Sequence, residues 1–186
     1  MRIFTLLSHL LLEINLASAL NKHDLRHVKR GGKTDATLYA YGADSAGWPI
    51  AYGLDDGLLY IAEDPDNSEA NLTPLTWDLA SITDECWIAN ATFINGKRAG
   101  CMYIMDEREY AVGILPQTRV AYVNGTVTGF GLFASQLVYN NNTLLQAQFW
   151  ARATNFTDTY GLTWTLDDGE PSGEFPVVVK ASTTST

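Results

Sequence analysis

Short apolar segments separated by turn residues constrain the fold more than any other feature of this chain. Downstream of residue 30, apolar and aromatic residues alternate with polar ones, and Gly, Asn and Asp recur about every eight to twelve positions. This spacing is typical of sandwiches and barrels, and no segment keeps a convincing helical period. The sequence therefore predicts an all-β fold, a single-domain antiparallel β-sandwich or barrel-like structure of about ten or more strands.

The predicted hairpins are centred on Asp-Gly and Asn-Gly, which tolerate the positive φ of tight turns. Their turns and flanking strands are 55–57 between 49–54 and 58–62, 95–96 between 87–94 and 99–105, and 124–125 between 119–123 and 126–133. A fourth turn, 140–143, joins 136–139 to 144–153, and late strands are predicted at 161–166 and 175–181. The side chains predicted to face the core from strand 161–166 are Leu162, Trp164 and Leu166.

A tryptophan on a polar strand face is a candidate for ligand binding. Because side chains alternate between the two faces of a strand, Trp150 shares its face with Gln146, Gln148 and Arg152. An indole beside an amide and a guanidinium is how many sugar-binding modules present a stacking platform. Trp150, Gln148 and Arg152 are therefore candidate carbohydrate-binding residues, with Trp48 on a predicted loop as a second candidate. The alternative is that Arg152 only stacks on Trp150, or that a loop covers both.

The N-terminus has the pattern of a secretory leader. Arg2 precedes an apolar run at 3–12 that is too short to span a bilayer, and the Ala-Ser-Ala segment 17–19 suits a signal peptidase. The pair Lys29-Arg30 is of the kind that kexin-type proteases cut. The predicted organisation is a signal peptide at 1–19, a pro-segment at 20–30, and a secreted, extracellular β-domain at 31–186 with a disordered tail from residue 181. The alternatives are an amphipathic helix that belongs to the fold, and a Lys-Arg pair that is merely exposed.

Five Asn-x-Ser/Thr triplets support the prediction of secretion. They begin at Asn71, Asn90, Asn124, Asn141 and Asn155. A glycan cannot be buried, so each occupied triplet would mark backbone that faces water. The domain is therefore predicted to be a glycoprotein.

The charge of the predicted domain argues against two classes of partner. Residues 31–186 contain seven Lys or Arg and 19 Asp or Glu side chains, which gives a net charge of −12. Such a surface repels nucleic-acid phosphates and anionic lipid headgroups, so neither nucleic acid nor membrane is an expected partner. The end of the chain, 180–186, is polar and offers no apolar tail for a lipid anchor. We expect a soluble monomer.

All three histidines, His9, His23 and His27, precede the predicted cleavage site. Removal of the leader and pro-segment would leave a domain without imidazole groups. That would exclude Ser-His and Cys-His nucleophiles as well as histidine-ligated metals. We therefore expect no cofactor and no metal, and any catalysis would have to rely on carboxylates.

Adjacent carboxylates are the remaining catalytic candidates. The pairs are Asp55 with Asp56, Asp84 with Glu85, Asp106 with Glu107, and Asp167 with Asp168. Neighbours on a strand point to opposite faces, so no pair converges on a substrate by itself. An acid glycosidase would need two acids from different strands about 5–9.5 Å apart. A glutamine–glutamate pair, as in fungal acid proteases, could use Gln136, Gln146 or Gln148, but no motif of that family is present.

The acidic loop 63–69 is a candidate calcium site, because hard cations prefer clustered carboxylate oxygens. It lacks the glycine and the distant glutamate of the twelve-residue calcium loop. The signal for a metal is therefore not specific.

The two cysteines, Cys86 and Cys101, are expected to form a disulfide in a secreted domain. A two-residue Asn95-Gly96 turn would place Asn90 opposite Cys101 and leave Cys86 roughly 13 Å farther along the strand, beyond the reach of a disulfide. Either the chain bends between Cys86 and Asn90, or the hairpin loop is longer, or one cysteine bonds another chain. We expect the intramolecular bridge.

Several scaffold segments together resemble a group of uncharacterised small secreted proteins of filamentous ascomycete fungi. These segments are 37–42 (TLYAYG), 47–50 (GWPI), 57–62 (GLLYIA), 129–133 (GFGLF), 145–150 (LQAQFW) and 161–164 (GLTW). The resemblance covers roughly residues 37–180. It implies export and a role at a host interface or at the fungal wall, and it brings no catalytic residues with it.

Three functions are compatible with these observations. The first is a secreted extracellular interaction protein without catalytic machinery, effector-like or associated with the cell wall, whose partner is a host or cell-wall component or a glycan. The second is a carbohydrate-binding module that uses the tryptophan platform. The third is an acid hydrolase that uses paired carboxylates.

Overall fold

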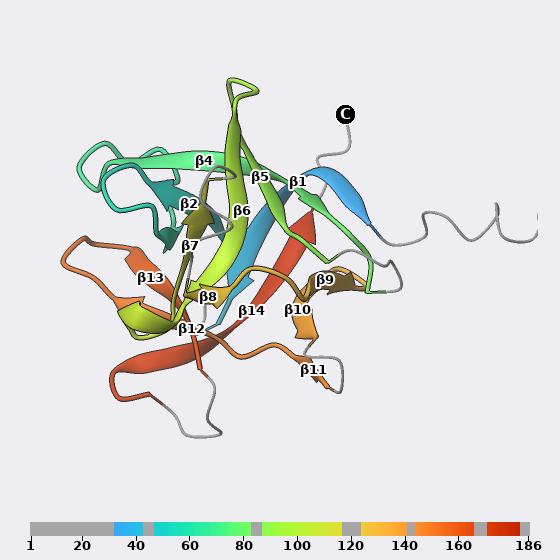
Figure 1. Cartoon of the computed structure of the whole chain (residues 1–186). Helices are drawn as coiled ribbons and strands as arrows, with labels where there is room; N and C mark the ends of the chain where they lie inside the picture. Colours follow the sequence, from blue (N-terminus) through green and yellow to red (C-terminus); the bar gives the residue numbers. More distant parts are fainter. Residues whose placement is uncertain are drawn as a thin grey trace, which may run out of the picture. The chain divides into compact units, whose positions relative to one another are not determined.

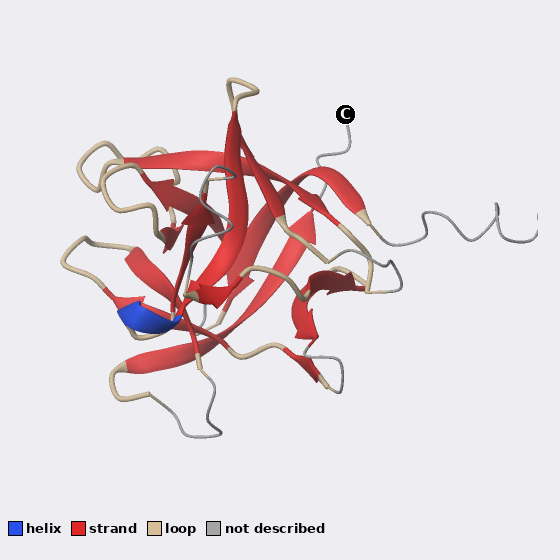
Figure 2. Ribbon diagram, in the orientation of Figure 1, coloured by secondary structure: helices blue, strands red, loops and turns tan. Residues whose placement is uncertain are grey.

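Antiparallel strands dominate the computed structural model, which describes residues 32–42, 47–82, 87–116, 124–140, 144–165 and 171–182. All of these residues belong to one unit, Gly31–Thr186. The predicted all-β class is confirmed (Figure 2).

Fourteen strands and one short helix are found in this part of the chain. The strands are β1 (Lys33–Tyr41), β2 (Trp48–Gly53), β3 (Leu59–Ala62), β4 (Leu72–Leu79), β5 (Asn90–Phe93), β6 (Arg98–Met105), β7 (Ala111–Leu115), β8 (Gly125–Thr126), β9 (Phe130–Phe133), β10 (Gln136–Asn140), β11 (Leu145–Gln146), β12 (Phe149–Ala153), β13 (Thr159–Trp164) and β14 (Glu174–Ser182). The helix, η1 (Asp106–Arg108), is a single 3-10 turn between β6 and β7.

Nine of the strands close an antiparallel barrel (Figure 1). Successive pairings run β1-β14-β12-β13-β7-β6-β5-β4-β2 and return to β1. The other five strands, β3, β8, β9, β10 and β11, lie outside this ring. Of the two architectures that the sequence predicts, the structure has the barrel.

Barrel closure involves β1, β2 and β4, each of which pairs with both of the others. In β1, Ala36 lies opposite Trp77 of β4, and Tyr39 lies opposite Pro49 of β2. Farther along β2, Ala51 begins the pairing with β4. Strands that divide one edge between two neighbours must bend, and bent, tilted strands are what a closed barrel requires.

The core is filled by alternate side chains of the barrel strands and by side chains of the outer strands β3, β9 and β10. The largest fully buried side chains are Trp77, Phe130, Phe149, Leu38, Ile50, Leu59, Leu75, Met102, Leu132, Leu137, Leu162 and Val112. Leu162 and Trp164 both belong to the main hydrophobic core, as predicted, and Leu166 lies outside the described residues. A smaller cluster of Ala51, Ala62 and Leu72 packs on the opposite face of β2 and β3.

The hairpin at Asn95-Gly96 has the predicted register but a different loop. The Phe93 amide donates to the Lys97 carbonyl at 2.9 Å, which gives a loop of three residues in place of the predicted two. A register shift between β5 and β6 compensates for the extra residue, so Asn90 still lies opposite Cys101. The hairpin at 55–57 is also confirmed, because β2 and β3 pair on either side of it.

The turn predicted at Asn124-Gly125 is wrong. Gly125 lies inside β8, which pairs with β6, and the predicted partner strand 119–123 lies outside the described residues. The strand predicted at 126–133 is shorter, because only Phe130–Phe133 forms β9. Gly129, with a φ of 105°, precedes it. Gly125 itself pairs with Met105 of β6, whereas Asn124 precedes β8.

The later strands differ from the prediction mainly in their bounds. The segment 144–153 is divided into β11, which pairs with β10, and β12, which pairs with β13 and β14. The turn that precedes β11 falls at 141–143, outside the described residues. β14 continues to Ser182, so the predicted disordered tail is wrong for Ala181 and Ser182, while 183–186 are not described.

Candidate functional site

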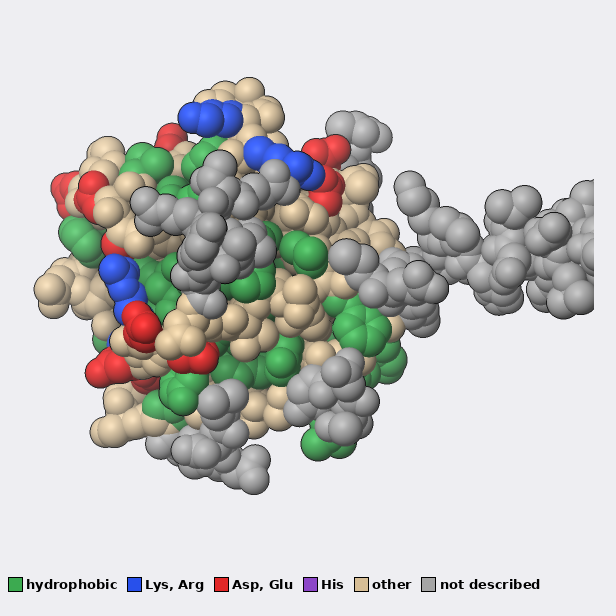
Figure 3. Space-filling view, viewed as in Figure 1, with side chains coloured by type: hydrophobic (Ala, Val, Ile, Leu, Met, Phe, Trp, Pro, Cys, Tyr) green, Lys and Arg blue, Asp and Glu red, His purple; other side chains and the backbone are tan. Residues whose placement is uncertain are grey.

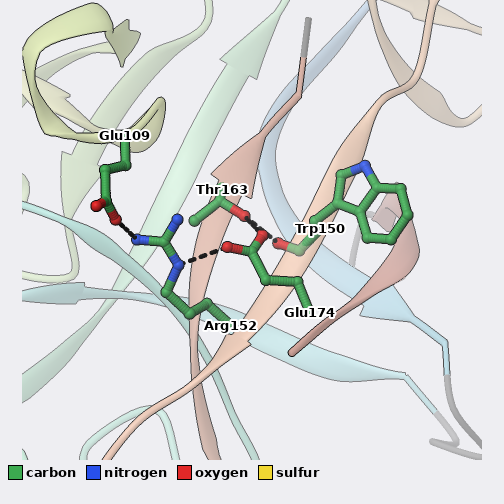
Figure 4. A network of polar contacts seen from close by, with 5 residues as sticks. All are labelled: Glu109, Trp150, Arg152, Thr163 and Glu174. Carbon is green, nitrogen blue, oxygen red and sulfur yellow. Dashed lines mark hydrogen bonds and ion pairs between the residues drawn. The ribbon is translucent and has the colours of Figure 1, made fainter. Parts of the chain in front are cut away.

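Trp150, the predicted stacking platform, is not a surface residue. Its exposed fraction is 9 %, and its neighbours Phe149 and Ala151 face the core on the other side of β12. The indole points away from Arg152 (Figure 4). Stacking a sugar requires an accessible ring face, so the predicted exposure of Trp150 is wrong and the platform is not present.

Arg152 is held by two carboxylates rather than by Trp150. Its Nε donates to Glu174 at 2.5 Å and its Nη1 donates to Glu109 at 2.7 Å (Figure 4). The Glu174 side chain is 5 % exposed, and it also accepts the Thr163 hydroxyl at 2.6 Å. A buried carboxylate requires such compensation, because leaving it unpaired is costly. The guanidinium therefore neutralises Glu174 and is not a free donor for a ligand.

The other two predicted ligand-binding residues are also part of the scaffold. Gln148 is half-buried, and its Oε1 accepts no hydrogen bond from the described residues. Trp48 is in β2, not in a loop, and its ring lies 5.9 Å from that of Tyr160, which in turn lies 5.2 Å from the Phe175 ring. These rings pack against the core, so the four predicted residues do not form one site.

The structure instead brings polar and aromatic side chains together in a groove of about 780 Å³. We call it the tyrosine–acid groove. It is lined by Tyr52, Leu54, Asp55, Asp56, Gly57, Tyr103, Met105, Glu107, Arg108, Ile114, Leu115, Pro116 and Asn124. These residues come from β2 and the β2–β3 loop, from β6 and η1, from β7 and the residue after it, and from the residue before β8. The groove is the candidate functional site, because concave surfaces with convergent polar groups are where ligands usually bind.

One side of the groove is formed where the β2–β3 loop docks on β7. The Gly57 carbonyl accepts the Ile114 amide at 2.9 Å, and Leu58 forms an antiparallel bridge with Gly113. A Cβ atom at Gly113 would lie 2.7 Å from the Gly57 oxygen and 2.4 Å from the Met105 methyl group. The loop can approach this closely only because residue 113 has no side chain.

The other side of the groove is formed by the turn between β6 and β7. It carries Glu107 and Arg108 in η1 and then reverses through Glu109 and Tyr110, both with left-handed φ values of 49° and 58°. The bond from Arg152 to Glu109 connects this turn to β12. Figure 3 shows acidic and basic side chains beside one another on the surface over η1. The Arg152 network thus lies behind the groove and supports the turn that lines it.

The carboxylates of the groove have partners in the protein. Asp55 accepts the Asn71 amide at 2.7 Å, and Glu107 accepts the Asn124 amide at 3.3 Å. Asp56 accepts the Tyr60 hydroxyl at 2.6 Å. These bonds hold the acids in place, while each keeps lone pairs for a ligand.

Burial and the Asp56 carboxylate both disfavour the ionisation of two nearby tyrosines. Burial, the hydrogen bond to Asp56 and the charge of Asp56 raise the pKa of Tyr60 far above its usual value. Burial and the Asp56 charge also raise the pKa of Tyr52. Both tyrosines are therefore neutral hydroxyls at physiological pH.

The groove unites members of two of the four predicted carboxylate pairs. Asp55 and Asp56 line it from the β2–β3 loop, and Glu107 lines it from η1. The other two pairs, 84–85 and 167–168, lie outside the described residues. Sequence reasoning missed Tyr52, Tyr103 and Arg108. The available signal was the acidic turn at 55–57, but nothing in the sequence relates that turn to η1.

The acidic loop 63–69 does not gather its carboxylates around one point. Asp64 accepts the Asp66 amide at 3.1 Å, and Asn67 accepts the amides of Glu69 and Ala70. These are turn-forming contacts. Among the residues that the structure describes, no group of three or more His, Cys, Asp or Glu side chains could hold a metal ion.

The Cys101 side chain is buried, and burial raises the pKa of its thiol. Its Sγ lies 3.7 Å from the Leu115 carbonyl oxygen. The expected partner, Cys86, lies outside the described residues, so the disulfide stays a prediction.

The predicted glycosylation sites differ in accessibility. Asn124 and Asn155 are exposed, whereas Asn71 and Asn90 are half-buried, and Asn141 lies outside the described residues. Asn155 suits a glycan best, because the sugar must face water and because Asn124 lines the tyrosine–acid groove.

Replacing Asp56 by Asn should lower the pKa of Tyr60 toward the usual tyrosine value, because the charge that opposes tyrosinate is lost. Ultraviolet titration of the wild type against Tyr60→Phe isolates the Tyr60 signal, and the same comparison is made in the Asp56→Asn background. A Tyr60 signal that does not move between the two backgrounds would contradict the assignment.

The raised pKa of Tyr60 has a defined effect on stability. In the unfolded chain tyrosine titrates at a pKa of about 10, so above that pH the native state retains a proton that the unfolded state loses. The stability that Tyr60 contributes through its raised pKa is fully present below a pH of about 10, and it is lost as the pH rises through the native pKa. In the Tyr60→Phe variant, the free energy of unfolding should therefore decrease less steeply than in the wild type as the pH rises in the alkaline range.

Replacing Gly113 by Ala should separate the β2–β3 loop from β7 and lower the free energy of unfolding by about 1–3 kcal/mol. Denaturant unfolding measures the loss, and faster hydrogen exchange at the Ile114 amide reports the broken bond to Gly57. Gly161→Ala is the matched control, because its Cβ would meet only the Arg152 oxygen at 3.9 Å. Equal effects of the two substitutions would contradict the close approach.

No protein family, no curated protein and no solved structure matches the chain. In the described ranges, no helix is long and apolar enough to cross a membrane. The resemblance to small secreted fungal proteins therefore stays a prediction that rests on the sequence segments alone.

Proposed function

We propose that the protein is a secreted, non-catalytic interaction protein, effector-like or associated with the cell wall, which binds its partner through the tyrosine–acid groove. Secretion is supported by the N-terminal pattern and the five glycosylation triplets. Binding is supported by the groove, in which the β2–β3 loop and η1 present carboxylates and one arginine beside tyrosines from β2 and β6.

The observation that carries this proposal is the convergence of polar side chains from the β2–β3 loop and the η1 turn on one concave surface. Exposed acids on a solvated surface are ordinary, but here Asp56 and Glu107 share a groove with Tyr52 and Tyr103. Tyrosines are enriched at recognition surfaces because they offer both an apolar ring and a polar hydroxyl.

A variant that combines Tyr103→Leu with Glu107→Gln should lose the partner while keeping the fold. The wild type and this variant are immobilised in parallel, exposed to extracellular fluid and wall extract, and the retained components are compared by mass spectrometry. Asp158→Asn is the control, because Asp158 is an exposed acid with a φ of 51° that Asn also tolerates. If the groove variant retains the same components as the Asp158→Asn control, the groove is not the surface that binds the partner.

A second candidate is an acid hydrolase, favoured by the fact that Asp56 and Glu107 come from different loops and line the same groove. It requires one acid as proton donor and the other as base or nucleophile. Asp56→Asn and Glu107→Gln should then each abolish turnover of glycan or protein substrates between about pH 3 and 6. The absence of turnover by the wild type across broad substrate panels would eliminate this candidate.

A further inference from the structure

The tyrosine–acid groove has an excess of negative charge. Among the residues that the structure describes, Asp55, Asp56 and Glu107 line it, against the single cation Arg108. All four side chains are exposed, so a ligand can reach them. Burial and, after it, the Asp56 carboxylate raise the pKa of the neighbouring Tyr52 and Tyr60. The groove therefore favours a positively charged ligand.

The base of the groove is apolar. Met105, Ile114 and Leu115 line it and are 6 %, 3 % and 3 % exposed. Tyr52 and Tyr103 are half-buried lining residues, so their rings are partly available to a ligand. A ligand that matches this surface has an apolar portion, a planar or cationic group for the tyrosine rings, and a positive charge for the carboxylates.

We propose that the tyrosine–acid groove binds an arginine side chain presented by a segment of the partner protein, an inference that rests on the proposed function. The methylene groups of arginine pack on the apolar base. The guanidinium lies against a tyrosine ring and donates to carboxylate oxygens in the planar geometry that suits it. The net charge of −12 on residues 31–186 adds a long-range attraction toward a basic partner.

Other ligand classes fit the groove less well. An anionic ligand would meet three carboxylates and only one guanidinium, Arg108. A neutral oligosaccharide could donate to the carboxylates, but its affinity would depend little on salt or on the charge of the groove. The class of ligand can therefore be identified from whether its affinity rises or falls when a charged side chain of the groove is replaced by a neutral one.

The test uses two short peptides, one with a central arginine among Gly and Ser residues and one with citrulline in its place. Citrulline has nearly the same shape but no charge. Binding of each to the intact secreted protein is measured by calorimetry at low salt and again at high salt. The arginine peptide should bind about tenfold or more tightly than the citrulline peptide, and the difference should shrink at high salt.

Three single substitutions add a charge-specific readout. Glu107→Gln should weaken binding of the arginine peptide about three- to tenfold, whereas Arg108→Gln should strengthen it by a similar factor, because the competing cation is removed. Asp158→Asn removes an acid outside the groove and should leave the affinity unchanged. Circular dichroism of each variant confirms that the fold is retained.

The outcomes separate this inference from the proposed function. Equal affinity for both peptides, no affinity for either, weaker arginine binding after Arg108→Gln, or binding of neutral oligosaccharides in their place would overturn the arginine site. The proposed function would survive these results if the groove variants still lose the extracellular partner. If the groove variants still bind that partner, the proposed function is wrong, regardless of how the two peptides bind.

Discussion

A single close backbone approach determines whether the candidate site exists. The Gly57 carbonyl reaches the Ile114 amide only because Gly113 has no side chain between the β2–β3 loop and β7. This contact sets the position of Asp55 and Asp56 relative to the opposite side of the groove. The barrel supplies a rigid wall, and the missing Cβ lets a loop from a distant part of the sequence rest on it.

The opposite side of the groove depends on a polar network behind it. Glu174 is almost fully buried and must be compensated, and Arg152 compensates it while also reaching Glu109 in the η1 turn. Glu109 itself is 80 % exposed, so its bond to Arg152 contributes more to the placement of the turn than to stability. The same guanidinium therefore relieves a buried charge and connects β12 to the turn that carries Glu107.

The sequence predicted the fold class well and the site poorly, for reasons that particular residues show. Alternation correctly placed Leu162 and Trp164 in the core, because strand periodicity is a local property. The same rule gave Trp150 the correct face but not its burial, which depends on what covers that face. The β9–β10 hairpin was missed because Ala134, with a φ of 56°, occupies a turn position where Gly or Asn is expected. The groove was missed because its acids come from loops that only barrel closure brings together.

Cys101 lies in β6, opposite Leu115 of β7, with its thiol buried and its pKa raised. A thiol reacts as thiolate and only when it is accessible, so in the reduced protein this one is protected as long as the two strands stay paired. The rate at which this thiol is alkylated would therefore report how often β6 separates from β7. The strand pair that forms part of the groove wall thus contains an internal reporter of how often the barrel comes apart.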